Sequence, residues 1–270
     1  MVTTTILGDV VEQLVGEAAD VEVVMPSNAD PHDFAASAQQ AASMREADAL
    51  VVNGLGFEEG LLDTVDGAED DGVRVITAAD AIEPIALSEA GATPDDPHFF
   101  TDPARMRDAA ELIAEQLVET IPSLDTAAMD VRVAAYLTAL DALDAEVEGL
   151  LAGIPTQDRV LVTNHEVFGY FADRYHFDVL GVIVPGGSTL AEPSAADLAE
   201  LARQIDEQGV PAIFAETSSR TRLADALAAE GTDVEVVALY SESLGEPGSP
   251  GDTYIGMLRT DAARIAVALT

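Results

Sequence analysis

The sequence predicts an α/β fold of two lobes, each with a parallel sheet flanked by helices, joined by one long rigid helix. Three observations support this prediction. Short β-branched runs alternate with helix-like segments in both halves of the chain, which is typical of parallel sheets covered on both faces. The stretch between the halves carries a helical pattern, and 270 residues suffice for two separate cores. We expect lobes over residues 1–122 and 153–270, with the linking helix over 123–152.

The linking helix is predicted by an apolar stripe between Ser123 and Leu151, a stretch without proline. Apolar residues recur there at steps of three and four, which places them on one face of a helix about 40 Å long. Ser123 is expected to cap its start, and Gly153 and Pro155 are expected to end it. The alternative interpretation is a long core helix in one larger domain.

In the N-terminal half, β-branched runs predict strands and amphipathic runs predict helices in the following order. The predicted order is strand 2–5, helix 8–15, strand 21–25, helix 38–47, strand 49–54, helix 58–65, strand 73–80 and helix 103–121. The segments 26–34 and 83–101 are expected to be irregular loops, and each contains a histidine.

The C-terminal half repeats this plan. The predicted order is strand 159–164, a helix through Tyr175, strand 179–184, helix 193–208, strand 212–216, helix 220–229, strand 234–240 and helix 253–268. A loop rich in Gly and Pro precedes the last helix.

The charge of the chain is extreme. Fifty acidic residues face twelve basic ones, a net charge of −38, and all twelve are arginine. At about 1 M salt the Debye length falls to about 3 Å, which screens repulsion of this kind. The composition therefore indicates a protein adapted to concentrated salt, as in halophiles. It excludes nucleic-acid binding, because a phosphate backbone requires a basic patch.

The sequence also bears on the compartment in which the protein works. With no cysteine there is no disulfide framework and no thiolate metal site. No apolar run approaches the roughly 20 residues of a membrane span, so we expect a soluble chain. The first residues run straight into the strand-and-helix pattern without a signal peptide, which leaves a cytoplasmic protein or one whose targeting segment has been removed.

Three of the four histidines are expected at the edge where open α/β sheets bind ligands, beyond the carboxyl ends of strands. His32 and His98 both lie in the tripeptide Asp-Pro-His, and His165 lies at a strand-to-helix turn in the other half. A single loop histidine is usually structural, but three at matching positions indicate a metal site. His176, at a helix end, is expected to have a surface or capping role.

Zn²⁺ usually takes four donors, and in a chain without cysteine the fourth should be a carboxylate. The first candidate is Glu242, directly after the last predicted strand. Asp252 is expected to cap the final helix instead. Glu216, at the end of strand 212–216, is expected to have a structural or supporting role.

A set of segments runs in order through nearly the whole chain: TTTILGDVVEQLVG, DPHDF, ADALVVNGLGFEEGL, DPHFFTDP, LDALDAE, TNHEVFGYFADRYHFDVLGV, EPSAADL, AIFAETSS, YSESLG and GDTYIGMLRTDAARIA. Together they resemble the metal-binding receptors of zinc and manganese ABC importers, a group that includes lipoproteins described as adhesins. The resemblance implies two α/β lobes joined by a rigid helix, with one metal ion in the interlobe cleft.

The metal ligands that this resemblance implies are His32, His98, His165 and Glu242. The family commonly has an SDSLG-like run at the last position, where this chain has SESLG. A histidine at the third position favours zinc, while glutamate there favours manganese, so we expect Zn²⁺ with Mn²⁺ as the alternative. The counterpart of the family's histidine-rich loop, LSEAGATPDD, is short here and has no histidine.

The resemblance also implies a receptor outside the membrane, anchored by lipid in its full-length form. It would pass its metal to an ABC transporter permease, and we expect a monomer. The rival interpretation from another class is a zinc-dependent hydrolase in which Glu166 or Glu242 activates water. No HExxH pair appears in the sequence, which favours the receptor. An additional role in adhesion is compatible with the same fold.

Overall fold

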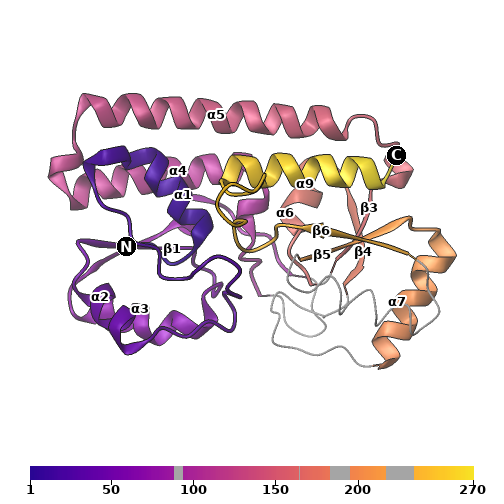
Figure 1. Cartoon of the computed structure of the whole chain (residues 1–270), viewed down its shortest axis with the longest axis horizontal. Coiled ribbons are helices and arrows are strands. Elements are labelled where there is room, and N and C mark those ends of the chain that lie inside the picture. Colours follow the sequence, from indigo (N-terminus) through magenta and orange to yellow (C-terminus); the bar gives the residue numbers. More distant parts are fainter. Residues whose placement is uncertain (88–93, 164, 183–194, 217–233) are drawn as a thin grey trace.

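The computed structural model describes residues 1–87, 94–163, 165–182, 195–216 and 234–270. Two parallel sheets lie side by side, one in each half of the chain, and the long helix α5 runs along both halves on one side of the molecule (Figure 1). This is the expected two-lobed α/β arrangement.

The N-terminal sheet is smaller than predicted. Strands β1 (Ala49–Val52) and β2 (Arg74–Thr77) pair in parallel, whereas the predicted strands 2–5 and 21–25 contribute only the bridges Val2–Val23 and Val2–Val51. The strand prediction for 2–5 was wrong because Thr4 caps a helix: its hydroxyl accepts a hydrogen bond from the Leu7 amide. Helix α1 (Thr5–Val15) therefore begins earlier than the sequence indicated.

Three further α-helices follow among the described residues of this half. α2 (Ala38–Arg45) begins with a capping box formed by Ser37 and Gln40. α3 spans Leu62–Asp70 and α4 spans Pro103–Thr120. The predicted start of α3 at Glu58 was wrong, because the Glu58 carboxylate is buried against backbone amides before the helix begins.

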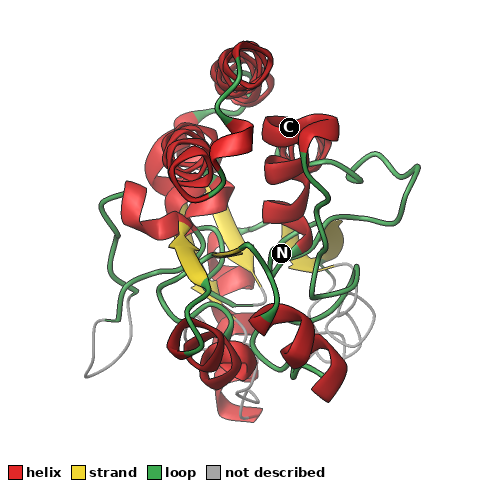
Figure 2. Cartoon of the chain, turned by 90° about the vertical axis from the view of Figure 1, so that its left-hand side faces the viewer, coloured by secondary structure: helices red, strands yellow, loops and turns green. Residues whose placement is uncertain are grey.

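The linking helix α5 spans Ala127–Leu151 and is capped by Thr126. The prediction that Ser123 caps it was wrong, since Ser123 lies in a separate 3₁₀ turn, Pro122–Leu124. The buried face of α5 packs on α1, α4 and α9, so the helix contacts both halves along its length. Figure 2 shows α5 as the outermost helix, on one side of the sheets.

The C-terminal sheet has four described parallel strands in the order β4-β3-β5-β6. They are β3 (Val160–Thr163), β4 (Asp178–Val182), β5 (Ala212–Glu216) and β6 (Glu235–Leu239). Helices α6 (Gly169–Tyr175), α7 (Ala195–Gln208) and α9 (Tyr254–Ala268) belong to this half. The predicted helix 220–229 lies outside the described residues.

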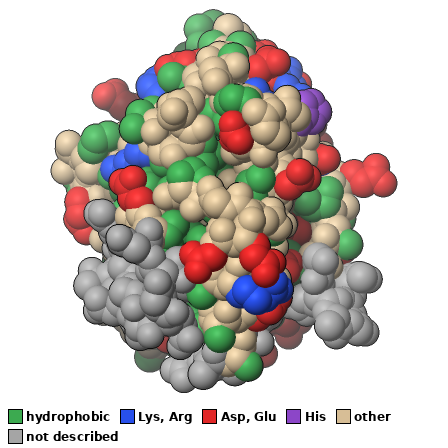
Figure 3. All heavy atoms as spheres, turned by 90° about the vertical axis from the view of Figure 1, so that its right-hand side faces the viewer, with side chains coloured by type: hydrophobic (Ala, Val, Ile, Leu, Met, Phe, Trp, Pro, Cys, Tyr) green, Lys and Arg blue, Asp and Glu red, His purple; other side chains and the backbone are tan. Residues whose placement is uncertain are grey.

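The largest hydrophobic cluster takes side chains from both halves, including Phe99, Leu140 and Tyr254. The halves therefore pack against each other through apolar side chains in this structure. On the face shown in Figure 3, acidic side chains are spread among apolar and polar ones instead of gathering in a single patch. Among the described helices, none combines the length and apolar composition needed to cross a bilayer.

Candidate metal centre

Four side chains from distant parts of the chain meet between the two halves: His32, His98, His165 and Glu242. Each offers one potential ligand atom, and these atoms lie within 4.8 Å of one another. None of the four residues is more than 2% exposed. Their convergence was predicted from the sequence, although the predicted strand before Glu242 ends at Leu239, slightly earlier than expected.

Glu242 is the centre of this group. Its Oε1 atom lies 2.8 Å from His32 Nε2, 3.0 Å from His165 Nε2 and 3.5 Å from His98 Nε2. Burial disfavours the charged carboxylate, but attraction to His165 and hydrogen bonds from the three imidazoles outweigh it and hold the Glu242 pKa well below its ordinary value. The carboxylate is therefore ionised and faces three ring nitrogens.

The two Asp-Pro-His tripeptides form the same local turn. Asp30 Oδ1 accepts the His32 amide at 3.0 Å, and Asp96 Oδ1 accepts the His98 amide at 2.9 Å. These turns fix the direction in which each histidine side chain extends from the backbone.

Carboxylates then orient the rings. His98 Nδ1 donates to Asp96 Oδ1 at 2.8 Å, and His32 Nδ1 donates to Glu59 Oε1 at 3.1 Å. Both rings therefore direct Nε2 towards Glu242, the arrangement by which carboxylates orient metal-ligating histidines. Glu59 is 38% exposed at its side chain, whereas Asp96 is buried.

The centre is built to hold positive charge. Burial disfavours the imidazolium of His98, but hydrogen bonds to Asp96 and Glu242 outweigh it and raise its pKa to about 9. A divalent cation bound by the Nε2 atoms would meet the Glu242 carboxylate, while Asp96 would keep its hydrogen bond to Nδ1 of the His98 ring. The second carboxylate oxygen, Glu242 Oε2, is buried and has no hydrogen-bond partner among the described residues, so a donor atom remains for such an ion.

An aromatic ring packs against two of the histidines. Phe57 packs edge-on against His32 and His98, with ring centroids 5.4 and 5.5 Å away.

The next residue, Glu58, is buried: its carboxylate accepts hydrogen bonds from the Thr3 hydroxyl at 2.6 Å and from the Asn53 amide at 2.6 Å. Glu58 thus fastens the end of β1 to the start of the chain.

The loop that carries His98 is held from both halves. Asn53 Nδ2, from the N-terminal half, donates to the Pro97 carbonyl at 2.9 Å. The Tyr170 hydroxyl, on α6 of the C-terminal half, donates to the Asp96 carbonyl at 2.7 Å. His98 is consequently positioned by both lobes.

The segment leading to Glu242 is anchored by α9. Asp261 Oδ1 accepts the Tyr240 amide at 3.1 Å, and Arg264 Nη1 donates to the Ala238 carbonyl at 2.8 Å. The Arg264 guanidinium also lies 4.9 Å from the centroid of the Tyr240 ring. These contacts fix the chain where it leaves β6 for Glu242.

Comparison with known proteins identifies this arrangement. A family model for the periplasmic component A of a zinc-uptake complex, ZnuA, matches residues 1–268. The chain belongs to the ZnuA family.

Among individual relatives of this ZnuA-family chain, the zinc-binding protein TroA of Treponema pallidum is 32% identical over 100% of the chain and 88% of the relative. The solved structure of the periplasmic TroA matches with a TM-score of 0.90 and 31% identity, covering 100% of this chain and 98% of that one. The manganese-binding lipoprotein MntA of Halalkalibacterium halodurans is 30% identical over 94% of the chain and 83% of the relative.

Membership of the ZnuA family confirms the expected fold and the class of solute-binding receptor for uptake. The hydrolase interpretation finds no support in the family. Glu166 and Glu216, the other carboxylates considered, do not belong to the four-residue group.

The prediction that Asp252 caps the last helix of this ZnuA-family chain was wrong. Thr253 is the cap, accepting the Gly256 amide, and Asp252 instead accepts the Gly248 amide at 2.8 Å. The Tyr254 amide, at the helix start, donates to Asp9 on α1. His176 is exposed and ends α6 with a left-handed backbone (φ 59°), as the predicted capping role required.

Only some of the residues that support the ZnuA-family site could have been predicted from the sequence. Asp96 could have been found, because the repeated Asp-Pro-His tripeptide includes it. Glu59 and Asn53 had no such signal, since each reaches its partner from another segment of the chain.

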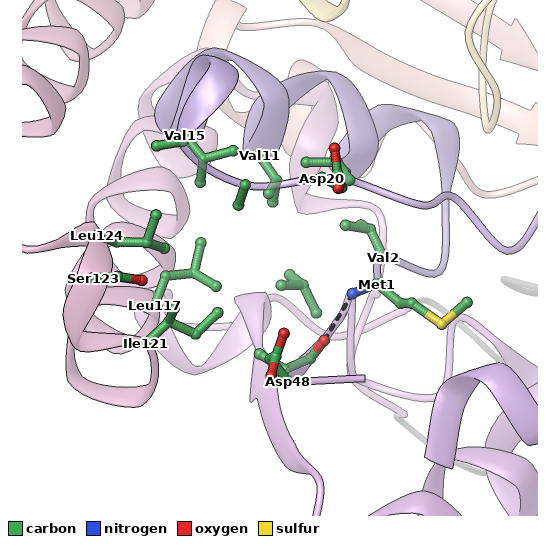
Figure 4. Close-up of a pocket in the computed structure, with 15 residues that line it drawn as sticks. Met1, Val2, Val11, Val15, Asp20, Asp48, Leu117, Ile121, Ser123 and Leu124 are labelled. Atoms are coloured by element: carbon green, nitrogen blue, oxygen red, sulfur yellow. Dashed lines mark hydrogen bonds between the residues drawn. The ribbon is translucent and has the colours of Figure 1, made fainter. Parts of the chain in front are cut away.

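A separate cavity of about 270 Å³ lies where β1 begins, lined by apolar side chains of α1, α4 and the N-terminal residues (Figure 4). Val15, Leu117 and Leu124 point into it, and Asp20 and Asp48 lie at its margin. None of the four converging residues lines this cavity, so it is separate from the candidate metal centre of this ZnuA-family chain.

Proposed function

We propose that this protein captures one divalent metal ion between its lobes and passes it to an ABC transporter permease. The Nε2 atoms of His32, His98 and His165 and the carboxylate of Glu242 would hold the ion. The observation that carries the proposal is the convergence of three imidazoles on one buried carboxylate oxygen, at 2.8, 3.0 and 3.5 Å. Because the donors come from both lobes, uptake and release would require the lobes to move relative to each other.

We propose zinc as the cargo. Three imidazole nitrogens and one carboxylate suit Zn²⁺, whereas Mn²⁺ prefers a larger share of oxygen donors. Relatives at similar identity are named for each metal, TroA for zinc and MntA for manganese. The donor set of this chain therefore supports the choice more than the relatives do.

We propose that the protein works on the outer side of the cytoplasmic membrane, held by a lipid anchor in its full-length form. The family description is periplasmic, and relatives such as MntA are named lipoproteins. Residues 1–122 and 153–270 would act as the two lobes, with α5 between them.

Calorimetric titration of chelator-treated protein with Zn²⁺ and with Mn²⁺ tests this function. We expect one ion per chain, tighter binding of zinc, and loss of most affinity in His98→Ala. His176→Ala is the matched control, because His176 is exposed and outside the converging group. Equal affinities of the two variants, or absence of binding in the unmodified protein, would refute the proposal.

A further inference from the structure

The loop that carries Glu242 is tied directly to the N-terminal half of the chain. Ser243, the next residue, accepts the Asn28 amide through its hydroxyl at 2.9 Å. The Leu244 amide donates to the Thr5 hydroxyl at 2.9 Å, and the Thr5 and Ser243 hydroxyl oxygens lie 3.2 Å apart. Three consecutive residues of this loop, Glu242, Ser243 and Leu244, therefore contact the other half.

The Ser243 hydroxyl is largely buried, at 8% residue exposure. It completes its bonding by donating to the Leu244 carbonyl at 3.2 Å. The Asn28 amide bonds to Ser243 and the Leu244 amide bonds to Thr5, so both hydrogen bonds exist only while the halves are together. If the halves separated, these groups would have to form hydrogen bonds with water instead. A further contact, from Asn28 Nδ2 to Glu246 Oε1 at 2.7 Å, lies on the exposed surface and contributes less.

The tie also reaches the first histidine. Asn28 adopts a left-handed backbone (φ 63°) in the loop that ends at His32, a conformation that asparagine tolerates better than most residues. Ser243 therefore links the loop of one metal-binding candidate, His32, to the loop of another, Glu242. The Nε2 and Oε1 atoms of these two residues are 2.8 Å apart.

We propose that Thr5, Asn28 and Ser243 form an interlobe latch that positions Glu242 and slows release of the bound metal. The latch rests on the proposed function, because it acts on the same site. Metal held by all four donors requires the closed arrangement, and the latch forms only in that arrangement. Affinity therefore rises with the fraction of the protein that is closed.

Ser243→Ala tests the latch, with Ser241→Ala as its matched control. Ser241 lies on the other side of Glu242, and its buried hydroxyl has no partner among the described residues. Mixing zinc-loaded protein with excess chelator in a stopped-flow instrument gives the release rate. We expect release from Ser243→Ala to be about tenfold faster, as for the loss of one or two hydrogen bonds, and release from Ser241→Ala to be unchanged.

The hydroxyl of Thr5 provides a second test. Thr5→Val removes it at constant size and should accelerate release as Ser243→Ala does, whereas Thr5→Ser keeps it and should retain the unmodified rate. The double variant should release zinc little faster than either single variant, because both break the same latch. Equal release from Ser243→Ala and Ser241→Ala would overturn the proposal.

A measurement without metal separates the latch from the metal site. The chain has no cysteine, so Glu69→Cys on α3 and Asp206→Cys on α7 would place two unique spin labels. Both helices lie on the side of the molecule away from α5, where lobe opening should be large (Figure 1). We expect Ser243→Ala to broaden the label distances, and an unchanged distribution would overturn the latch. Failure of the unmodified protein to bind zinc, by contrast, would overturn the proposed function and the effect on release together.

Discussion

We expect Asp261 to make the stability of this fold depend on pH. Its side chain is fully buried, with Oδ1 accepting the Tyr240 amide and Oδ2 without a partner among the described residues. Burial raises the Asp261 pKa well above the ordinary value of 3.8, against the hydrogen bond from Tyr240 and the charge of Arg264, 4.0 Å away.

The sign and size of the effect follow from proton linkage. A carboxyl whose pKa is raised by folding binds its proton more tightly in the folded state, so the stability it contributes is present below pH 3.8 and is lost as pH rises through the folded pKa. Within that window, one proton lowers the free energy of unfolding by up to about 1.4 kcal/mol per pH unit. Asp261→Asn removes the titration while its amide oxygen can still accept the Tyr240 amide.

Urea unfolding in molar KCl between pH 4 and pH 8 measures this effect. The difference in unfolding free energy between the unmodified protein and Asp261→Asn cancels the other titrating groups. We expect it to change steadily in favour of the variant from pH 4 upward. Gln208→Asn, an exposed change on α7 that removes no titratable group, should give a flat difference. A flat difference for Asp261→Asn as well would refute the reasoning.

Other predictions concern salt, capping and metal. The unfolding midpoint should rise steeply from low to molar KCl, because screening relieves the repulsion of a −38 charge; a flat midpoint would contradict this. Thr253→Ala should lower the unfolding free energy in urea titrations by about 1 kcal/mol, the usual cost of a lost cap, and Asp252→Ala should lower it less. Zinc at a hundredfold excess over its dissociation constant should add about 2.7 kcal/mol to the unfolding free energy, and calorimetric scans without a shift would count against the site. His165→Glu should move the preference in competitive titrations towards manganese, because it replaces a nitrogen donor with oxygen; an unchanged preference would contradict the assignment.

The sequence predicted the converging side chains because strand ends and loop positions are local properties. His165 follows strand β3, whose residues Leu161, Val162 and Thr163 are buried, and His32 and His98 share a tripeptide whose aspartate shapes the turn. The carboxyl ends of parallel strands lie at one edge of a sheet, so these patterns placed the candidates at the ligand-binding edge of each half. That the two edges face each other was implied by the family resemblance.

Other features depended on contacts that the sequence does not reveal. Ser123 was expected to cap α5, but it lies in the 3₁₀ turn Pro122–Leu124, and the hydroxyl of Thr126 caps the helix. Asp252 was expected to cap α9, but its carboxylate accepts the Gly248 amide, and the neighbouring Thr253 caps the helix. Glu58 matched a helical pattern, but a contact with Thr3, 55 residues away, keeps it outside the helix.

The span of chain between His32 and Glu242 has a consequence for the order of folding. These two residues meet across a sequence separation of 210, so the complete donor set exists only once nearly the whole chain is ordered. A metal ion that needs all four donors would therefore not nucleate the folding of one lobe early. We expect the refolding rate of the protein to be independent of zinc. Its unfolding rate should fall as zinc is added, because the ion would stabilise contacts that form after the folding barrier. A nascent chain would bind the metal last.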